Sequence, residues 1–406
     1  MDIKEERSQR FATWIKNSQK IKPKKETKIS EKHKVGTITP TFTATDLSKI
    51  LDVPVESVTS AVNALVSEGY EIKRNGNHSR SSYVLTHEVC VMIAKELGIQ
   101  TLAERKANGE DIPCVITTSH QGKGGVGKST TVNTMACQSH FDFKHQPRTL
   151  LIDGDPQGTL RHLSSEEMKA TEATITTIMT SAFQLTREER LAPEKQAEYR
   201  AALDKLMIRH QLNSIRILPS QAMDKYFSLN FCSEFTKVDS IDAAKVKIMT
   251  VFKDCIISPL QDLFDQIIVD TNPDTNLTTL MYLYATTHLI VPVTGRNTDI
   301  DAFKDFFKVL EMLGDNLMPD DGGLFEMRPI ITMNRKQPKT IDDNATKILK
   351  AMGDAFQTKI AYSLAYEVAS EKGVPIHLLE RKSSVTAALP LLEEVYNEYK
   401  LWVDWD

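Results

Sequence analysis

The sequence predicts an α/β fold in which a doubly wound, mostly parallel sheet is flanked by helices. Three observations lead to this prediction. From residue 112 onward, apolar runs of strand length alternate with helix-length segments. A glycine-rich stretch at 122–130 joins the first run to a helical segment. Ahead of it, residues 39–108 follow the order helix, turn, helix and hairpin. We therefore expect three parts, at 1–38, 39–108 and 109–406.

Composition is ordinary for a soluble, cytoplasmic protein. The 406 residues suffice for two or three domains, and 41% are hydrophobic and 26% charged. No apolar run reaches the roughly 18 residues of a membrane span, and the N-terminus is charged. The five cysteines form no C-x-x-C pair, which favours reduced thiols. The net charge of −4 does not by itself indicate nucleic acid.

The glycine-rich stretch has the form G-x-x-x-x-G-K-[ST] of a phosphate-binding loop. Its residues are Gly122, Lys123, Gly124, Gly125, Val126, Gly127, Lys128, Ser129 and Thr130. Glycines let backbone N–H groups turn toward phosphate oxygens, and the following helix contributes its positive N-terminal end. Lys128 can reach the β- and γ-phosphates, and Ser129 can ligate Mg²⁺. A plain flexible loop is the weaker alternative, because a strand-like run, Cys114–Ile116, directly precedes it.

A second lysine, Lys123, stands inside the loop directly before two glycines. Two cations so close together exceed what one site needs, so we expect Lys123 to reach a nucleotide on a second subunit. The pattern K-G-G-x-G-K-[ST] resembles the deviant Walker A ATPases, which include ParA, MinD and the nitrogenase iron protein. The resemblance covers the chain from about Ile112 to the C-terminus. It implies a homodimeric ATPase with ATP and Mg²⁺ as cofactors.

Two further apolar runs end in carboxylates, at Asp153 and Asp155 and again at Asp270. Ligands bind beyond the carboxyl ends of strands in open α/β sheets. By the resemblance, Asp155 orients the attacking water, Asp153 supports the Mg²⁺ shell, and Asp270 is the Walker B carboxylate that holds Mg²⁺ through water. ParA-like chains usually have two prolines after Asp-Thr, whereas Asn272 occupies one of those positions here.

The same resemblance assigns catalysis to Lys123, Lys128 and Asp155. It makes Met333 and Asn334, at the end of a later strand, the candidates for contact with adenine.

Residues 39–108 are predicted to form a winged helix-turn-helix domain, which places its second helix in the major groove of DNA. Helices are expected at 45–51 and 55–67, a hairpin at 70–85, a further helix at 87–97 and a polar linker at 104–111. Short polar residues on the second helix and basic residues on the hairpin are the candidates for DNA contact. They are Ser57, Thr59, Ser60, Asn63, Lys73, Arg74 and Arg80. A winged helix used only for protein contact remains the alternative.

Positive charge gathers in two other places. Residues 1–35 hold eleven Lys and Arg against five Asp and Glu. This segment forms either a helix that packs on a partner in a dimer or a mobile basic arm. In the ATPase part, Arg296, Arg335 and Lys336 are candidates for DNA contact. We expect DNA affinity to fall steeply with salt.

The family includes three types of protein with different functions, and the sequence can be compared with each. A MinD-type protein would end in a basic amphipathic helix, whereas residues 391–406 hold five acids and one lysine, so no membrane contact is expected. An iron protein would need cysteines in loops after the signature strands, and none stands there. The order of an N-terminal helix, a winged helix and an ATPase resembles the larger ParA proteins.

The ParA resemblance implies a weak, partner-stimulated ATPase that segregates plasmids or chromosomes. Such proteins bind DNA non-specifically as an ATP dimer or filament on the nucleoid, repress their own operator and respond to a ParB-type centromere-binding protein. An ATP-gated, site-specific transcriptional regulator is the alternative function.

Overall fold

The computed structural model describes residues 36–76, 82–165, 174–221, 224–225, 227, 240–317, 319, 326–335 and 338–405. The helix or arm predicted at 1–38 therefore lies almost wholly outside the described residues. The DNA-contact candidates Arg80 and Lys336 lie outside them as well.

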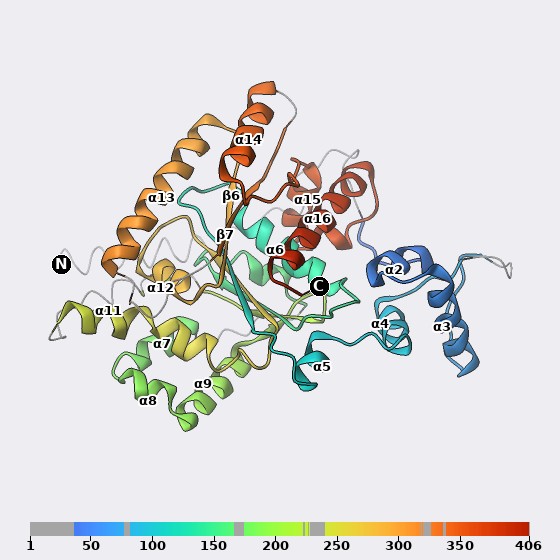
Figure 1. Ribbon diagram of the computed structural model, residues 1–406, viewed down its shortest axis with the longest axis horizontal. Coiled ribbons are helices and arrows are strands. Elements are labelled where there is room, and N and C mark those ends of the chain that lie inside the picture. Colours follow the sequence, from blue (N-terminus) through green and yellow to red (C-terminus); the bar gives the residue numbers. More distant parts are fainter. Residues whose placement is uncertain are drawn as a thin grey trace, which may run out of the picture. The chain divides into compact units, whose positions relative to one another are not determined.

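A sheet lies at the centre of the fold, with helices around it (Figure 1). It has seven strands in the order β3-β4-β2-β5-β1-β6-β7. The strands are β1 (Val115–Ser119), β2 (Thr149–Gly154), β3 (Ile208–Arg209), β4 (Ile215–Leu218), β5 (Gln266–Thr271), β6 (His288–Val293) and β7 (Glu326–Ile331). All neighbours pair in parallel except β3 and β4. The predicted mostly parallel sheet is confirmed, and the two-residue edge strand β3 was not predicted.

Helices and single turns occupy most of the remaining described chain. They are α2 (Ala44–Leu51), α3 (Val55–Ser67), α4 (His87–Glu96), α5 (Leu102–Ala107), α6 (Lys128–His140), η2 (Leu160–Leu163), α7 (Ile175–Ala182), α8 (Arg187–Leu191), α9 (Pro193–Leu206), α11 (Ile241–Met249), η4 (Lys253–Ile257), α12 (Leu277–Ala285), α13 (Asn297–Leu317), α14 (Lys339–Met352), α15 (Leu364–Lys372), η5 (Ile376–Leu378) and α16 (Ser383–Trp402).

The central strands β1, β2 and β5 are buried along their whole length, because helices cover a parallel sheet on both faces. Helix α6 packs against all three, and α16 packs on α6. Helices α12, α13 and α14 contact β1, β6 and β7, respectively. This arrangement brings the loops after β1, β2 and β5 to one edge of the sheet.

A buried network of polar side chains fastens α16 to the sheet. The Tyr399 hydroxyl lies 2.8 Å from Oγ1 of Thr117 and donates to Oε1 of Gln266 at 3.2 Å. Gln266 in turn donates to Oγ1 of Thr149 at 2.7 Å. The acidic tail thus contributes to the interior, with Trp405 also buried. None of the helices described here is long and apolar enough to cross a membrane.

Residues 39–108, here called the front module, have a second and smaller core. Leu47, Val58, Val62 and Ile93 form it, from helices α2, α3 and α4. The Thr43 side chain caps α2 through a capping box with Asp46. The observed α2 and α3 agree with the predicted helices to within one residue at each end.

The predicted hairpin is shorter than expected. Its two arms pair through one antiparallel bridge, Arg74 to Tyr83, and Val84 N–H donates to the Lys73 carbonyl at 2.8 Å. A third segment joins them, because Phe42 bridges Leu85. The order of helix, turn, helix and paired arms is the one that the sequence predicts.

The polar linker predicted at 104–111 is wrong in part, because α5 covers its first residues. Thr101 caps this helix, and Leu102 N–H donates to the His145 carbonyl at 2.9 Å. Lys106 pairs with the buried Asp265 at 2.9 Å. Polar composition suggested a solvated connection. Instead, a buried carboxylate of residues 109–406, here called the sheet part, pairs with the lysine and holds the segment against the sheet.

Candidate active site

The phosphate-binding loop joins β1 to α6, as its motif predicts. Gly125 and Gly127 have φ angles of +73° and +90°, which side chains other than glycine rarely adopt. Gly127 is the residue that precedes the first turn of α6. The free N–H groups of that turn therefore face the loop, where they can bind an anion.

Lys128 is buried and spans the base of the loop. Its Nζ donates to the carbonyl oxygens of Lys123 at 2.9 Å and Gln121 at 3.2 Å. Burial lowers the pKa of Lys128, and the carboxylates of Asp270 and Asp155 oppose that shift. The ammonium is thus held in the loop, where the two carboxylates offset part of the burial that disfavours its charge.

Asp153 and Asp270 stand opposite each other at the carboxyl ends of β2 and β5. Both are fully buried, and each has one oxygen, Oδ1 of Asp153 and Oδ2 of Asp270, without a hydrogen-bond partner among the described residues. Burial raises the pKa of Asp153 to about 8 and that of Asp270 to about 7. The charge of Asp270 adds to the rise at Asp153, and the charge of Asp155 adds to the rise at both. The Ser129 side chain opposes the rise at Asp270.

Two buried carboxylates with unpartnered oxygens beside a serine hydroxyl fit a divalent cation. Oxygen ligands suit Mg²⁺, which takes few protein ligands and completes its shell with water and phosphate. No group of three or more His, Cys, Asp or Glu suited to a metal occurs in the described part of the chain. The residues present therefore fit a cation shared with a nucleotide better than a cage made wholly of protein.

Asp155 follows β2 and is half-buried. Its carboxylate accepts from the Gln157 N–H at 2.9 Å, and its carbonyl accepts from the Ser220 hydroxyl. These bonds fix the backbone around Asp155. Its carboxylate lies near enough to Lys128 to raise the pKa of that lysine. The position is compatible with the predicted role of orienting water, which stays a prediction.

Lys123 has partners within its own chain. Its Nζ donates to Thr298 at 2.9 Å and pairs with Asp299 at the start of α13. Asp299 is buried and also accepts from the Thr294 hydroxyl. The lysine that is expected to reach a second subunit is therefore held in place here by a carboxylate of the same subunit.

A cavity of about 80 Å³ lies beside the start of α6. It is mostly apolar, and Gly127, Thr130, Met333, Tyr362 and Tyr366 are among the residues that line it. The predicted base contact Met333 is thus next to the phosphate loop, with a φ of +49°.

Asn334, the other predicted base contact, does not line this cavity. Its side chain donates to Asp342 at 3.1 Å. Tyr366 is the better-placed polar group, because its hydroxyl is buried without a partner among the described residues and its ring lines the cavity.

Several residues that shape the site were missed by the sequence reasoning. His120 precedes the loop, is buried, and lies 2.8 Å from Oγ1 of Thr271; burial lowers its pKa to about 3. Thr332 donates to the Val126 carbonyl at 2.6 Å and so braces the loop. Adjacency to the motif could have indicated His120, whereas Thr332 and Asp299 are distant in sequence and carry no motif.

The DNA-contact candidates are placed unevenly. Ser60, Asn63, Lys73, Arg74, Arg296 and Arg335 are exposed, and Ser57 and Thr59 are half-buried. The Thr59 hydroxyl donates to the Val55 carbonyl at 2.9 Å. The Tyr83 hydroxyl connects Asn63 and Arg74 by hydrogen bonds.

Arg335 stacks over the Tyr362 ring, 3.8 Å from its centroid. Since Tyr362 lines the cavity beside the phosphate loop, this arginine lies close to the candidate base site.

Comparison with known proteins places the chain in a family. Residues 114–320, half of the chain, match the family model described as AAA domain. The chain belongs to this family, which comprises ParA/MinD-like P-loop ATPases. An uncharacterized protein of Mycobacterium tuberculosis (strain ATCC 25618 / H37Rv) is 22% identical over 288 residues, which cover 70% of this chain and 77% of that protein.

Two solved structures share the fold to different extents. One titled "Partition Protein" matches with a TM-score of 0.63 and 14% identity, over 91% of this chain and 94% of its own. A cobyrinic acid a,c-diamide synthase from Mycobacterium smegmatis, solved with an ATP analogue and magnesium, has a TM-score of 0.51 and 16% identity, over 71% of this chain and 95% of its own. Residues 109–406 are less than three quarters of the chain, so the first likeness extends into the front module.

Proposed function

Starting from this family membership, we propose that the chain is a Mg-ATP-dependent ATPase of the ParA type, which partitions plasmid or chromosomal DNA. One observation carries the proposal. Two buried carboxylates, Asp153 and Asp270, each have an oxygen without a partner among the described residues. They lie beside the phosphate loop, in which Lys128 is held by hydrogen bonds to backbone carbonyls. The synthase that shares the fold was solved with an ATP analogue and magnesium, which supports the proposal that ATP and Mg²⁺ bind here.

Each residue has a stated role in this proposal. Ser129 and Asp270 would hold Mg²⁺, with Asp153 in support, and the bound cation would supply charge neutralisation for the β- and γ-phosphates. Lys128 and the loop N–H groups bind the phosphates. Asp155 orients the attacking water, and Lys123 reaches the nucleotide of a second subunit. The cavity beside Met333 takes the adenine.

The front module is proposed to be a winged helix-turn-helix that contacts DNA through α3 and its paired arms. The likeness to a partition protein over 91% of the chain supports this part, because the synthase matches only 71%. In this proposal Mg-ATP drives dimerisation and non-specific DNA binding or filament formation on the nucleoid. Hydrolysis, stimulated by a ParB-type partner, releases the DNA, and the dimer represses its own operator.

Two variants test the active site. Lys128→Gln should abolish ATP hydrolysis, and Asp155→Ala should abolish hydrolysis while ATP still binds. Normal hydrolysis by Asp155→Ala would show that another group orients the water. Phosphate release measured with and without a DNA duplex gives the readout.

The second candidate is an ATP-gated, site-specific transcriptional regulator. It is favoured by the contact between front module and sheet part, where His87 stacks on His140 with ring centroids 3.9 Å apart. A DNase footprint separates the two functions. Protection that spreads over arbitrary DNA with ATP supports partition, and protection confined to one operator supports the regulator.

A further inference from the structure

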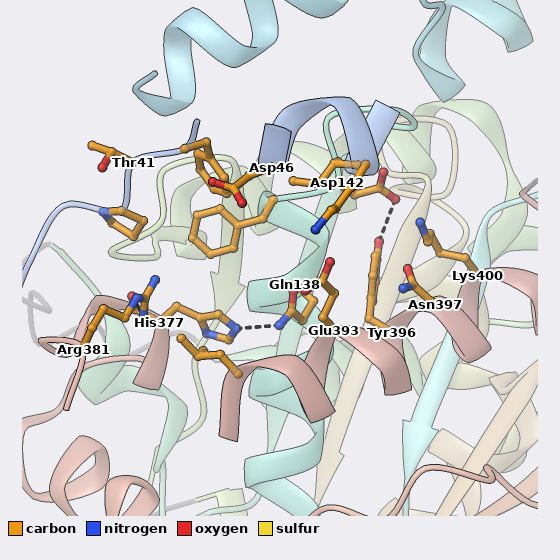
Figure 2. Close-up of a pocket in the computed structure, with 16 residues that line it drawn as sticks. Thr41, Asp46, Gln138, Asp142, His377, Arg381, Glu393, Tyr396, Asn397 and Lys400 are labelled. Carbon is orange, nitrogen blue, oxygen red and sulfur yellow. Dashed lines mark hydrogen bonds between the residues drawn. The ribbon is translucent and has the colours of Figure 1, made fainter. Parts of the chain in front are cut away.

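A cavity of about 380 Å³ lies between the front module and the sheet part, and no residue of the phosphate loop lines it (Figure 2). Its walls come from four segments distant in sequence. These are residues 40–50 of the front module, the end of α6 with Phe141, the turn around His377, and one side of α16. The cavity is large enough for a small organic molecule.

His377 places an unsatisfied donor in the wall of this cavity. Its side chain is 3% exposed, and its Nε2 lies 3.0 Å from the amide nitrogen of Gln138 (Figure 2). The amide nitrogen donates, so Nε2 accepts and the ring proton lies on Nδ1. Nδ1 is buried and has no hydrogen-bond partner among the described residues. An unmade hydrogen bond of this kind costs about 1–3 kcal/mol, which an acceptor on a ligand would recover.

Three cations and three carboxylates line the cavity. Lys49, Arg381 and Lys400 line it, and within the described residues none of them lies within 4.0 Å of a carboxylate oxygen. Among the described residues, the hydrogen bond that Arg381 donates goes to a backbone carbonyl, that of His377, at 3.3 Å.

The acids that line the cavity are mostly occupied. Asp46 accepts the N–H and hydroxyl of Thr43 in the cap of α2. Asp142 accepts from His145 and from the Tyr396 hydroxyl, the latter drawn in Figure 2. Glu393 is the remaining carboxylate among the lining residues, and it is exposed. Two of the three lining carboxylates are therefore already engaged, whereas the three cations have no carboxylate partner among the described residues.

Apolar groups also line the cavity. The rings of Phe42 and Phe141 lie 5.8 Å apart, and Ile50 and Leu389 lie beside the same space. A ligand with an anionic group and a partly apolar body would match both kinds of lining residue.

We propose that this cavity is a second ligand site, which binds a small anion bearing a carboxylate or phosphate group through Arg381, Lys49 and the Nδ1–H of His377. Its walls come from both the front module and the sheet part, so a bound anion holds the two together. The site is independent of nucleotide chemistry and stands or falls separately from the proposed ATPase function.

Calorimetric titration of the full chain with citrate and, separately, with inorganic phosphate tests the proposal. Lys128→Gln serves as the host protein, because that variant weakens phosphate binding at the phosphate loop. We expect saturable binding of one probe per chain, at up to about 10 mM ligand. Arg381→Gln in the same host should weaken it at least tenfold, and Lys372→Gln, an exposed change outside the cavity, should leave it unchanged. Preference for citrate or for phosphate identifies the anionic group.

A second variant keeps the test decisive if Arg381→Gln fails to fold. Lys49→Gln changes an exposed side chain and should weaken binding about threefold to tenfold. Absence of saturable binding by both probes would overturn the proposal. Binding that neither Arg381→Gln nor Lys49→Gln weakens would overturn it as well, because the anion would then lie elsewhere.

Discussion

At the scale of single residues, the two strand-end carboxylates are the most informative groups. Burial raises the folded-state pKa values of Asp153 and Asp270 far above those of the unfolded chain. The folded protein therefore retains protons that the unfolded chain releases above about pH 4. In the absence of Mg²⁺ and nucleotide, these two groups make the protein less stable as the pH rises from about 4 to about 8.

Asp270→Asn isolates this effect. The variant removes one titrating group, so we expect its free energy of unfolding to fall less between pH 5 and pH 8 than that of the parent. Denaturant titrations at several pH values measure the difference. Asp354→Asn, an exposed substitution, should retain the parent's slope. Identical slopes for Asp270→Asn and the parent would mean that Asp270 is ionised in the unliganded protein.

Proton release also links metal binding to pH. A cation that takes both carboxylates must displace their protons, so Mg²⁺-dependent nucleotide affinity should rise between pH 6 and pH 8. Fluorescent ATP-analogue titrations at fixed Mg²⁺ provide the measurement. Affinity that is flat or falling over this range contradicts the assigned carboxylate roles.

Asp299 holds Lys123 within its own subunit, and that contact must break before Lys123 can reach a partner's nucleotide. A charge-assisted hydrogen bond contributes about 1.5–3 kcal/mol when buried and less where, as here, the lysine is partly exposed. We expect Asp299→Asn to dimerise with ATP at a threefold to tenfold lower protein concentration. Sedimentation velocity measures it, with the exposed Asp301→Asn on the same helix as control. Weaker dimerisation of Asp299→Asn would show that Asp299 prepares Lys123 rather than restraining it.

At the scale of elements, the buried polar network under α16 determines how the C-terminal helix is held. Tyr399→Phe removes a hydroxyl that bonds both Thr117 and Gln266, and leaves their side chains without that partner. We expect a loss of about 1–3 kcal/mol in the free energy of unfolding, measured by urea titration. The matched change at the exposed Tyr70 should cost less than about 0.5 kcal/mol. Equal costs at the two positions would mean that the network contributes nothing.

The strands and the phosphate loop could be predicted because their signals are local. Apolar runs indicate β2, β5 and β6. The motif Gly122–Thr130 indicates the phosphate loop and, at its end, the start of α6. The family resemblance assigned Asp153 and Asp270 to Mg²⁺, and the parallel pairing of β2 with β5 brings the two residues together at one edge of the sheet. The fold class agrees with the observed sheet, and the family agrees with the comparisons.

The remainder depends on contacts between distant residues. Helix α5 is held against the sheet by the ion pair of Lys106 with Asp265, which lies more than 150 residues away in sequence. Nothing near Lys123 indicates Asp299, and nothing near Val126 indicates Thr332. Tyr366 lines the candidate base site because of how α15 packs, which no motif encodes.

At the scale of the whole molecule, two stacked imidazoles join the front module to the sheet part. His87 lies on His140, and its Nε2 contacts the His140 carbonyl at 3.0 Å. Burial lowers the pKa of His87, and the hydrogen bond to the His140 carbonyl and the charge of Glu88 oppose this shift. Burial also lowers the pKa of His140 to about 2, and the nearby His87, His210 and His377 add to that shift. Burial therefore favours the neutral form of both rings in the folded state.

This contact should weaken in acid. In the unfolded chain these histidines bind protons below about pH 6.5, whereas their pKa values in the folded state are lower. Their contribution to the free energy of unfolding is therefore lost as the pH falls below about 6.5. We expect proteolysis between the front module and the sheet part to accelerate from pH 7 to pH 5. His87→Phe keeps a ring on His140 without its charge and should shift the midpoint to lower pH. An unchanged midpoint in His87→Phe would place the acid-sensitive group elsewhere.

The central claim is that ATP bound at the phosphate loop controls a grip on DNA. Fluorescence anisotropy of a random-sequence duplex, titrated with the full chain in Mg-ATP, in ADP and without nucleotide, tests it most directly. We expect tight binding in Mg-ATP only, with an affinity that falls by at least tenfold between about 50 and 200 mM salt. The Lys128→Gln variant should bind weakly in all three conditions. Equal affinity with and without ATP, or affinity that is insensitive to salt, would contradict the account.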